Sequence, residues 1–391
     1  MATQRLTEGT RLSEEHELFR DSFRQFLQSE VLPGFDQWEK DGIVPREVYR
    51  AAGENGFMGM EIPEEYGGVG VDDFWFNAVL HDEIGRTGAI GFGAGLTLHN
   101  DVCLPYFMHY ANDEQKERWL PGIASGELLT AVAMTEPGTG SDLAGIATRG
   151  TLDGDDYVVT GSKTFITNGI NADLIITAVR TEPDPRHGGL SLLIVERDTP
   201  GFDRGRNLEK AGMHSQDTAE LFFSEARVPR ANLLGEPGSG FSYLVHNLAR
   251  ERVSIAIAAV TAARGAIDWT IPYVRERHAF GKSIGEFQAV RHLLAEAFME
   301  TEVARTFVDR CIDKLNAGAL SAEEAAMAKY WATEAQGTAI DKCVQLHGGY
   351  GYMLEYPVAR AWADARAGRI YGGTNEIMKE IVGRSLLKGG L

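Results

Sequence analysis

The sequence is poor in cysteine: its 391 residues contain only Cys103, Cys311 and Cys343, which lie far apart. They form no CxxC pair and no spacing typical of a disulfide framework. The sequence therefore indicates a protein of a reducing compartment. We also expect no bound metal.

The sequence also lacks a long apolar run. No apolar stretch reaches the roughly 18 residues needed to cross a membrane as a helix. The N-terminal residues MATQRLTEGTRLSEEHELF contain no apolar core of a signal peptide and become acidic soon after Arg11. We therefore expect no membrane span and a cytoplasmic location, or the mitochondrial matrix if a transit peptide has been removed.

Basic residues are scarce: 38 Lys and Arg stand against 56 Asp and Glu, and the formal net charge is −18. With no basic run to offset it, this charge argues against a nucleic-acid partner. Anionic ligands are not excluded, because local Arg side chains and backbone N–H groups can bind them. The glycine-rich stretch IPEEYGGVG (62–70) has no GK[ST] after it and so is not a phosphate-binding P-loop.

What is present is a pattern that changes along the chain. Apolar residues recur at helical spacing from about 13 to 125, short β-rich runs follow to about 234, and the helical period then returns. Strands do not alternate with helices, so a doubly wound nucleotide-binding sheet is not expected. We predict an α+β multidomain fold with an N-terminal α-helical domain (1–127), a middle antiparallel β-domain (128–238) and a C-terminal four-helix bundle (239–391).

Two stretches in the β-rich segment could hold a ligand. MTEPGTGSDLAGI (134–146) ends a strand in a tight turn that could present N–H and hydroxyl groups to a ligand. A plain hairpin turn is the other interpretation. In KTFITNG (163–169), Phe165 beside Thr167 could cover one face of a planar ring, or Phe165 could belong to the core.

Three stretches in the C-terminal segment are further candidates. In RERHAFGKSIGEFQAV (275–290), Arg277 could meet a phosphate or could be a solvated helix-end residue. The adjacent glycines of QLHGGYGYMLEYPVAR (345–360) permit close approach to a ligand or to another subunit. In RIYGGTNEIMKE (369–380), Thr374 or Asn375 can cap a helix whose free N–H groups could face a ligand.

These stretches together resemble one family. TEPGTGSD, FITNG, ERHAFGK, QLHGGYGY and YGGTNE occur in the order and at the separations of the acyl-CoA dehydrogenases, and the resemblance spans nearly the whole chain. It implies three domains (α, β, α), bound FAD and commonly a homotetramer. It further implies α,β-dehydrogenation of a fatty acyl-CoA to the trans-2-enoyl-CoA in β-oxidation, with an electron-transfer flavoprotein as acceptor.

The catalytic base departs from the commonest family pattern. Most members read Tyr-Glu-Gly-Thr and use that Glu, but this chain has Gly372 there, and Glu376 is a weak substitute. A branch that includes long-chain and isovaleryl-CoA dehydrogenases carries the base on the first helix of the C-terminal domain, where Glu251 falls at the matching position. The resemblance thus implies Glu251 as base, with its pKa raised by burial. On residues alone, Glu251 and Arg252 would be an ordinary surface pair. We also expect the missing Cβ of Gly372 to leave space beside the base.

The resemblance assigns other site residues by position. Those expected along FAD are Val132, Met134, Thr135, Gly140, Ser141, Phe165, Ile166, Thr167, Arg277, Phe280, Gln288, Gln345, Gly348, Gly349, Thr374, Asn375 and Glu376. Among these, Arg277, Phe280 and Gln288 are expected to reach the FAD of a neighbouring subunit. Those expected along the acyl-CoA are Ser141, Arg186, His187, Ala249, Arg250, Arg252, Tyr371, Gly372 and Gly373.

Substrate and reaction type remain open between several possibilities. HAFGKSIGEFQ, EYPVARAWADAR and IYGGTNEIMKE look most like the long-chain type. The small residues of GAIGFGAGLTLHN (88–100) indicate either tight helix packing or room for a long apolar ligand, and those of 91–96 fit a deep tail cavity. Branched, cyclic or steroid-side-chain thioesters are alternatives, as is an acyl-CoA oxidase or a flavin monooxygenase on the same scaffold. A non-catalytic acyl-CoA- or nucleic-acid-binding relative is opposed by the net charge and by Glu251.

Overall fold

The N-terminal part of the chain is helical. The computed structural model describes residues 12–182 and 189–390, so the expected CoA contacts Arg186 and His187 lie outside the described residues. The helices of this part are α1 (Glu14–Phe26), α2 (Leu32–Asp41), α3 (Arg46–Glu54), α4 (Trp75–Thr87), α5 (Ile90–Thr97), α6 (Leu104–Tyr110) and α7 (Asp113–Ala124). A stretch of π-helix, η3 (Leu98–Cys103), makes α5 and α6 almost continuous.

The middle part is a sheet with strand order β6-β7-β3-β2-β4-β5-β8, and β1 pairs with β4 off this path. Its strands are β1 (Thr130–Ala133), β2 (Arg149–Asp153), β3 (Asp156–Thr167), β4 (Leu174–Arg180), β5 (Leu190–Glu196), β6 (Phe202–Asn207), β7 (Thr218–Pro229) and β8 (Leu233–Leu234). The sheet is mainly antiparallel, as predicted, but β1 runs parallel to β4. Residues 134–173 separate these two strands, a connection long enough for the chain to re-enter the sheet in the same direction.

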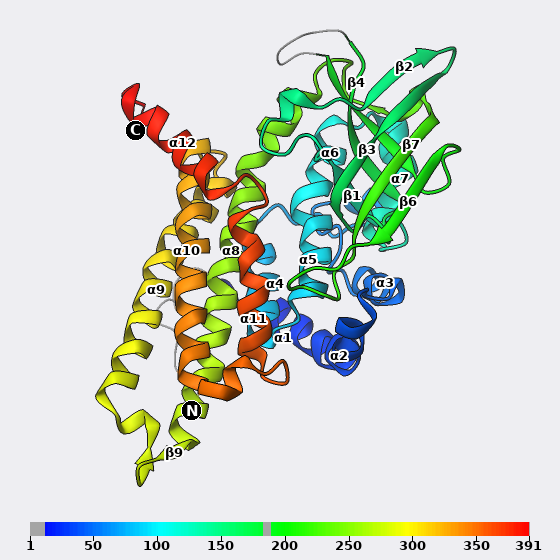
Figure 1. Ribbon diagram of the computed structural model, residues 1–391. Coiled ribbons are helices and arrows are strands. Elements are labelled where there is room, and N and C mark those ends of the chain that lie inside the picture. The colour runs from blue at the N-terminus through cyan, green and yellow to red at the C-terminus, as the bar shows by residue number, and fades with distance from the viewer. Residues whose placement is uncertain (1–11, 183–188, 391) are drawn as a thin grey trace.

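The C-terminal part is the predicted helical bundle. The long helices α8 (Gly240–Glu276), α9 (Gln288–Asn316) and α10 (Ala322–His347) lie side by side in Figure 1, and α11 (Pro357–Ala365) packs on α8 and α10. Helix α12 (Asn375–Leu387) packs against the opposite end of α10. A small hairpin of β9 (His278–Ala279) and β10 (Lys282–Ser283) projects from the far end of the bundle, between α8 and α9 (Figure 1). No helix in the described ranges is both long and apolar enough to cross a bilayer.

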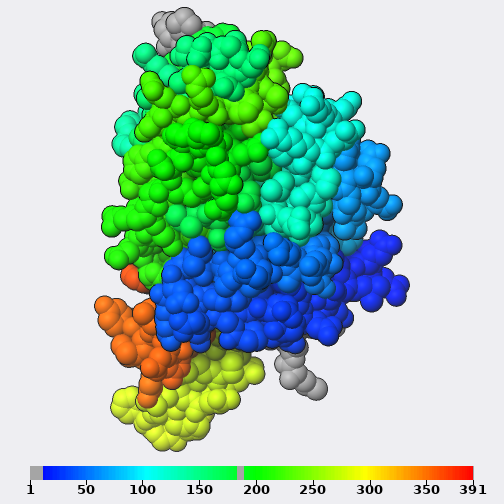
Figure 2. Space-filling model, turned by 90° about the vertical axis from the view of Figure 1, so that its right-hand side faces the viewer, coloured from blue at the N-terminus to red at the C-terminus, as the bar shows by residue number. Residues whose placement is uncertain are grey.

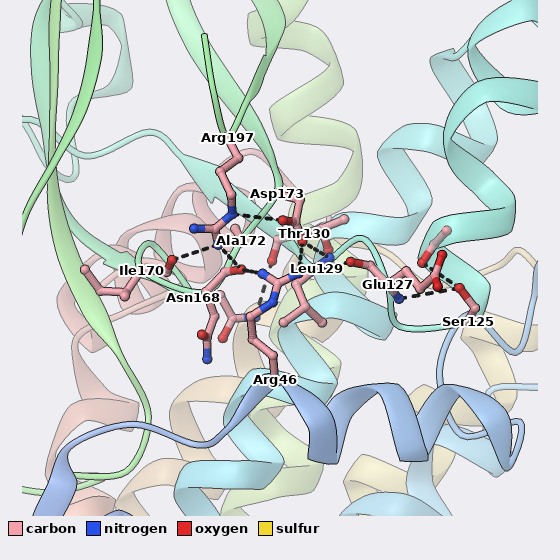
Figure 3. Close-up of polar contacts among 12 residues, drawn as sticks. Arg46, Ser125, Glu127, Leu129, Thr130, Asn168, Ile170, Ala172, Asp173 and Arg197 are labelled. Atoms are coloured by element: carbon pink, nitrogen blue, oxygen red, sulfur yellow. Dashed lines mark hydrogen bonds and ion pairs between the residues drawn. The ribbon is translucent and has the colours of Figure 1, made fainter.

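The N-terminal helices join the other two parts. On the face shown in Figure 2, the N-terminal segment (blue) lies between the sheet region (green) and the end of the bundle (orange and yellow). Asp173, in the loop between β3 and β4, is one anchor of this junction (Figure 3). Its carboxylate accepts hydrogen bonds from Arg46 of α3 at 2.7 Å, from Arg197 at 2.9 Å and from the Leu129 N–H at 2.9 Å. The junction therefore anchors the loop that directly follows the FITNG motif of β3.

The glycines of 91–96 serve close packing, and the expected tail cavity at this segment is wrong. A Cβ at Gly93 would overlap the side chain of Ile84, and a Cβ at Gly95 would overlap the hydroxyl group of Tyr49. The absence of a side chain lets neighbouring groups approach the α5 backbone directly. Tight helix packing was the right one of the two interpretations, because the volume that the glycines free is filled by other side chains.

Candidate active site

One face of helix α8 lines the floor of the site. Leu248, Glu251, Arg252 and Ile255 are spaced i, i+3, i+4 and i+7 and therefore share a face of the helix. Leu248 and Ile255 are partly exposed, whereas Glu251 is 5% and Arg252 6% exposed. The face thus places one buried carboxylate and one buried guanidinium between two aliphatic side chains.

Within the described part of the chain, the Glu251 carboxylate has one direct hydrogen bond. The hydroxyl group of Tyr106, a fully buried residue of α6, donates to its Oε1 at 3.1 Å. Burial raises the pKa of Glu251 to about 7, while the Tyr106 hydrogen bond and the charge of Arg252 oppose that rise. The carboxylate therefore exchanges its proton near neutral pH, which suits a general base.

The loop of the YGGTNE motif crosses this face. The Nε of Arg252 lies 3.4 Å from the carbonyl oxygen of Gly372 and donates to it. Gly372 has a φ of 65°, a conformation that favours glycine, and a Cβ added there would overlap the Cδ1 of Ile255. The space expected beside Gly372 is therefore not empty: Ile255, one turn after Glu251, occupies it.

A buried lysine holds the same loop from the other side. Lys329 of α10 is fully buried and donates to the Gly373 carbonyl at 2.8 Å and to Asn375 Oδ1 at 2.9 Å. Thr374 caps α12 by accepting a hydrogen bond from the Ile377 N–H at 3.4 Å, as its position predicted. The side chain of Asn375 is thus engaged within the protein, whereas Glu376 is exposed. The sequence reading missed Lys329, because a lysine inside an apolar helical pattern carries no signal of its burial.

A second buried carboxylate shapes the TEPGTG turn. Glu136 accepts a hydrogen bond from the fully buried Lys163 at 2.8 Å and from the N–H groups of Ala147 and Thr148 at 2.7 and 3.0 Å. Burial alone would raise the pKa of Glu136, but Lys163 and these N–H groups hold it below its usual value. This pair ties the turn to β3, and the sequence reading missed it as well.

The turn and the FITNG motif present open groups. A Cβ at Gly138 or at Gly140 would meet no atom of residues 12–182 and 189–390 within 4 Å, and Ser141 is exposed. Phe165 is 68% exposed and adopts a φ of 59° within an irregularity of the β3–β7 pairing. Ile166, by contrast, is buried in the core of the sheet, so only its backbone can face a ligand. The remaining predicted residues of this group, Val132, Met134, Thr135 and Thr167, are half-buried.

The residues expected along CoA do not all face one space. Arg250 forms an ion pair with Glu61 and donates to the Asp101 carbonyl at 3.2 Å, so its guanidinium is engaged with the N-terminal part of the protein. Ala249 packs against the core of the bundle. Tyr371 is 45% exposed, and Arg252, Gly372 and Gly373 lie at the loop described above.

A separate group lies at the far end of the bundle (Figure 1). Arg277 follows α8, where its guanidinium stands 5.6 Å from the ring centre of Tyr350, and Phe280 is 95% exposed. The other predicted residues of this group are exposed as well: Gln288, Gln345, Gly348 and Gly349. Within one chain these residues lie apart from the TEPGTG turn and the YGGTNE loop, so a single subunit does not bring the two groups together.

Comparison with known proteins gives matches along the chain. Residues 13–127, 131–226 and 238–387 match the N-terminal, middle and C-terminal domain families of acyl-CoA dehydrogenase. The mitochondrial long-chain specific acyl-CoA dehydrogenase of Rattus norvegicus is 46% identical over 96% of this chain and 87% of its own length. The crystal structure of an acyl-CoA dehydrogenase from Geobacillus kaustophilus superposes with a TM-score of 0.94 at 51% identity, covering 96% of this chain and 99% of the other.

One further match is a chain in a structure of the electron transferring flavoprotein of Acidaminococcus fermentans. It superposes with a TM-score of 0.93 at 34% identity and covers 97% of this chain and 99% of its own. The relationship in every case extends over the helical, sheet and bundle parts together. The site described above must therefore be interpreted within a fold shared along the whole chain.

Proposed function

Since the chain belongs to the acyl-CoA dehydrogenase family, whose members are FAD-dependent oxidoreductases acting on the CH–CH bond of an acyl-CoA, we propose that Glu251 is its catalytic base. The observation that carries this proposal is a buried carboxylate with a pKa near 7, on the α8 face crossed by the YGGTNE loop. In that loop Gly372 has no group that can accept a proton, and Glu376 is exposed on α12.

The reaction removes one proton and one hydride from the acyl-CoA. Ionised Glu251 accepts the α-proton of the acyl-CoA, the hydride leaves Cβ, and the electron pair of the broken Cα–H bond becomes the trans double bond. FAD, when bound, supplies the acceptor for that hydride. Below its pKa Glu251 already holds a proton, so activity should fall as the pH drops below about 7.

The described residues fit a flavin. The open positions at Gly138 and Gly140 are a cradle that side chains would fill, and exposed Phe165 offers an aromatic face beside it. We propose that this turn, the half-buried Thr135 and Thr167, and the cap of α12 hold the isoalloxazine part of FAD. Arg277 offers a cation to the pyrophosphate. Because Arg277, Phe280 and Gln288 lie at the far end of the bundle, we propose that a second copy of the chain supplies them, so that the enzyme is an oligomer, as in the homotetramers common in the family.

The substrate and acceptor are proposed from the relatives. The identity to a long-chain enzyme supports a long-chain acyl-CoA, while the packing of the α5 glycines removes one argument for it. The match to a chain from a structure of an electron transferring flavoprotein supports such a flavoprotein as acceptor. Anaerobic flavin bleaching with acyl-CoAs of graded length and branching would test the substrate. The rate of reoxidation by oxygen against that by the flavoprotein would separate a dehydrogenase from an oxidase.

The test of the base is Glu251→Gln. The variant should keep its flavin absorbance and bind acyl-CoA, because the amide has the shape of the carboxyl group, while the rate of flavin reduction falls about 10²–10⁴-fold. Glu380→Gln is the matched control, since Glu380 is an exposed residue of α12 that pairs with Arg384. Near-normal flavin reduction by Glu251→Gln would contradict the assignment.

A further inference from the structure

We propose that Tyr106 is a positioning residue for the base: its hydroxyl group holds Oε1 of Glu251, so that Oε2 is the atom that takes the α-proton. This rests on the proposed function of Glu251. Tyr106 donates to Oε1 at 3.1 Å, and Oε2 has no hydrogen-bond partner among the described residues. The two oxygens of the carboxylate are therefore not equivalent, and the free one is available to the substrate.

The Tyr106 ring is held by its surroundings. It is fully buried in a core that includes Leu104, Phe107 and Leu244. The π-helical segment that leads into α6 is also fixed, because the Asn100 amide donates to the Phe57 carbonyl at 2.8 Å. A phenol in so packed a setting has little freedom to follow a moving partner. The packed ring can instead orient the Glu251 carboxylate.

A second contact fixes the distance between the two helices. Ser254, three residues after Glu251 on α8, donates to Oδ2 of Asp101 at 2.5 Å. Asp101 lies five residues before Tyr106, on η3, and His81 of α4 also contacts this carboxylate at 2.9 Å. The pairs Tyr106–Glu251 and Asp101–Ser254 thus join the same two helical segments at neighbouring positions. Two such contacts restrain both the spacing and the rotation of α8 at Glu251.

The groups around Glu251 explain why Tyr106 matters for its charge. Arg252 of α8 attracts the carboxylate but donates its hydrogen bond to Gly372, and Cys103 of η3 is a buried neutral thiol. Tyr106 is thus the one direct hydrogen-bond donor to Glu251 among the described residues. Asn247, one turn before Glu251, is buried and opposes the rise in the pKa of Tyr106, but its Nδ2 makes no hydrogen bond within the described ranges.

The test is Tyr106→Phe in the FAD-loaded enzyme. Loss of the donor disfavours the ionised carboxylate, so the acid limb of kcat/KM should move up by about one pH unit, and kcat/KM at pH 6 should fall about tenfold. A tyrosine that only fills the core would leave the pH profile in place. Tyr110→Phe is the matched control: Tyr110 lies one turn further on α6, stacks on Tyr243 with ring centres 3.9 Å apart, and should leave the profile unchanged.

A readout that does not depend on turnover is the infrared carboxyl band of Glu251, identified by its loss in Glu251→Gln. Its titration midpoint should rise in Tyr106→Phe and fall when 3-fluorotyrosine, a more acidic phenol, is placed at position 106. Unshifted midpoints in both variants would overturn the proposal. If Glu251→Gln still reduces flavin normally, the proposed function fails. If it is inactive but Tyr106→Phe retains the wild-type profile, only the role of Tyr106 is wrong.

Discussion

Glu251 and Glu136 are both buried, at 5% and 7% exposure, yet their pKa values move in opposite directions. Burial raises both. At Glu136 the ammonium group of Lys163 and two backbone N–H groups outweigh burial, whereas at Glu251 a single phenol and a more distant guanidinium do not. Burial therefore does not distinguish the structural carboxylate of Glu136 from that of the proposed base, Glu251. The number and the charge of the hydrogen-bond donors around each carboxylate do distinguish the two.

The two carboxylates also differ in what they hold together. Glu136 joins the TEPGTG turn to β3, and its charge is compensated by the ammonium group of Lys163. Glu251 has one hydrogen bond among the described residues, on the α8 face that the YGGTNE loop crosses. A fully satisfied carboxylate would be a poor base, because its partners stabilise the ionised form that must accept the proton. Substitutions at the Lys163–Glu136 pair and at Glu251 test this difference.

The largest expected effect comes from breaking the structural pair. Lys163→Met leaves the charge of Glu136 buried without its ion-pair partner and should lower the free energy of unfolding by about 3–5 kcal/mol. Thermal or urea unfolding would measure this loss. Adding Glu136→Leu to the same chain should recover part of it, because the buried charge is removed. A Lys163→Met protein as stable as the wild type would show that the Lys163–Glu136 ion pair does not stabilise the fold, and would contradict the contrast with Glu251.

Removing the carboxylate of the proposed base, Glu251, should instead raise the free energy of unfolding. The pKa of Glu251 is about 7 in the folded protein and near 4.5 in the unfolded chain, so its ionisation costs folding free energy once the pH exceeds about 4.5, and the cost is complete above about 7. Glu251→Gln should therefore raise stability by about 2–3 kcal/mol at pH 8 and by much less at pH 5. Unfolding measured at these two pH values checks the prediction. An equal gain at both would mean that the charge of Glu251 is not the cause.

The smallest expected effect concerns the loop above Glu251. Gly372→Ala places a Cβ on the Cδ1 of Ile255 and imposes a positive φ on alanine, which should cost about 1–2 kcal/mol of stability. Gly383→Ala, within α12 where an added Cβ meets no atom within 4 Å, should instead gain up to about 1 kcal/mol. Thermal unfolding of both variants gives the comparison. If both gained stability, the loop would not be tightly packed on α8.

Much of the fold could be predicted from local patterns in the sequence. The helical, β-rich and helical segments follow from residue spacing over a few turns or a few strand residues, and the glycine-rich motifs mark the loops. Gly372 stands where the commonest family pattern has the catalytic Glu, and the sequence therefore already predicted Glu251 as the base. The far-end group around Arg277 was also expected to serve another subunit, and the structure places it away from the TEPGTG turn.

By itself, then, the sequence determined the order of the three parts, the family and the candidate base, because periodicity and motifs are properties of neighbouring residues. Tertiary structure decided the rest. Tyr106 lies 145 positions before Glu251, and nothing in LPYFMHY distinguishes its hydroxyl group from that of any core tyrosine. The same holds for Lys163 on Glu136 and for the packed glycines of α5. Which polar groups meet depends on how helices and strands pack, and that packing sets the donors around each carboxylate and hence its charge.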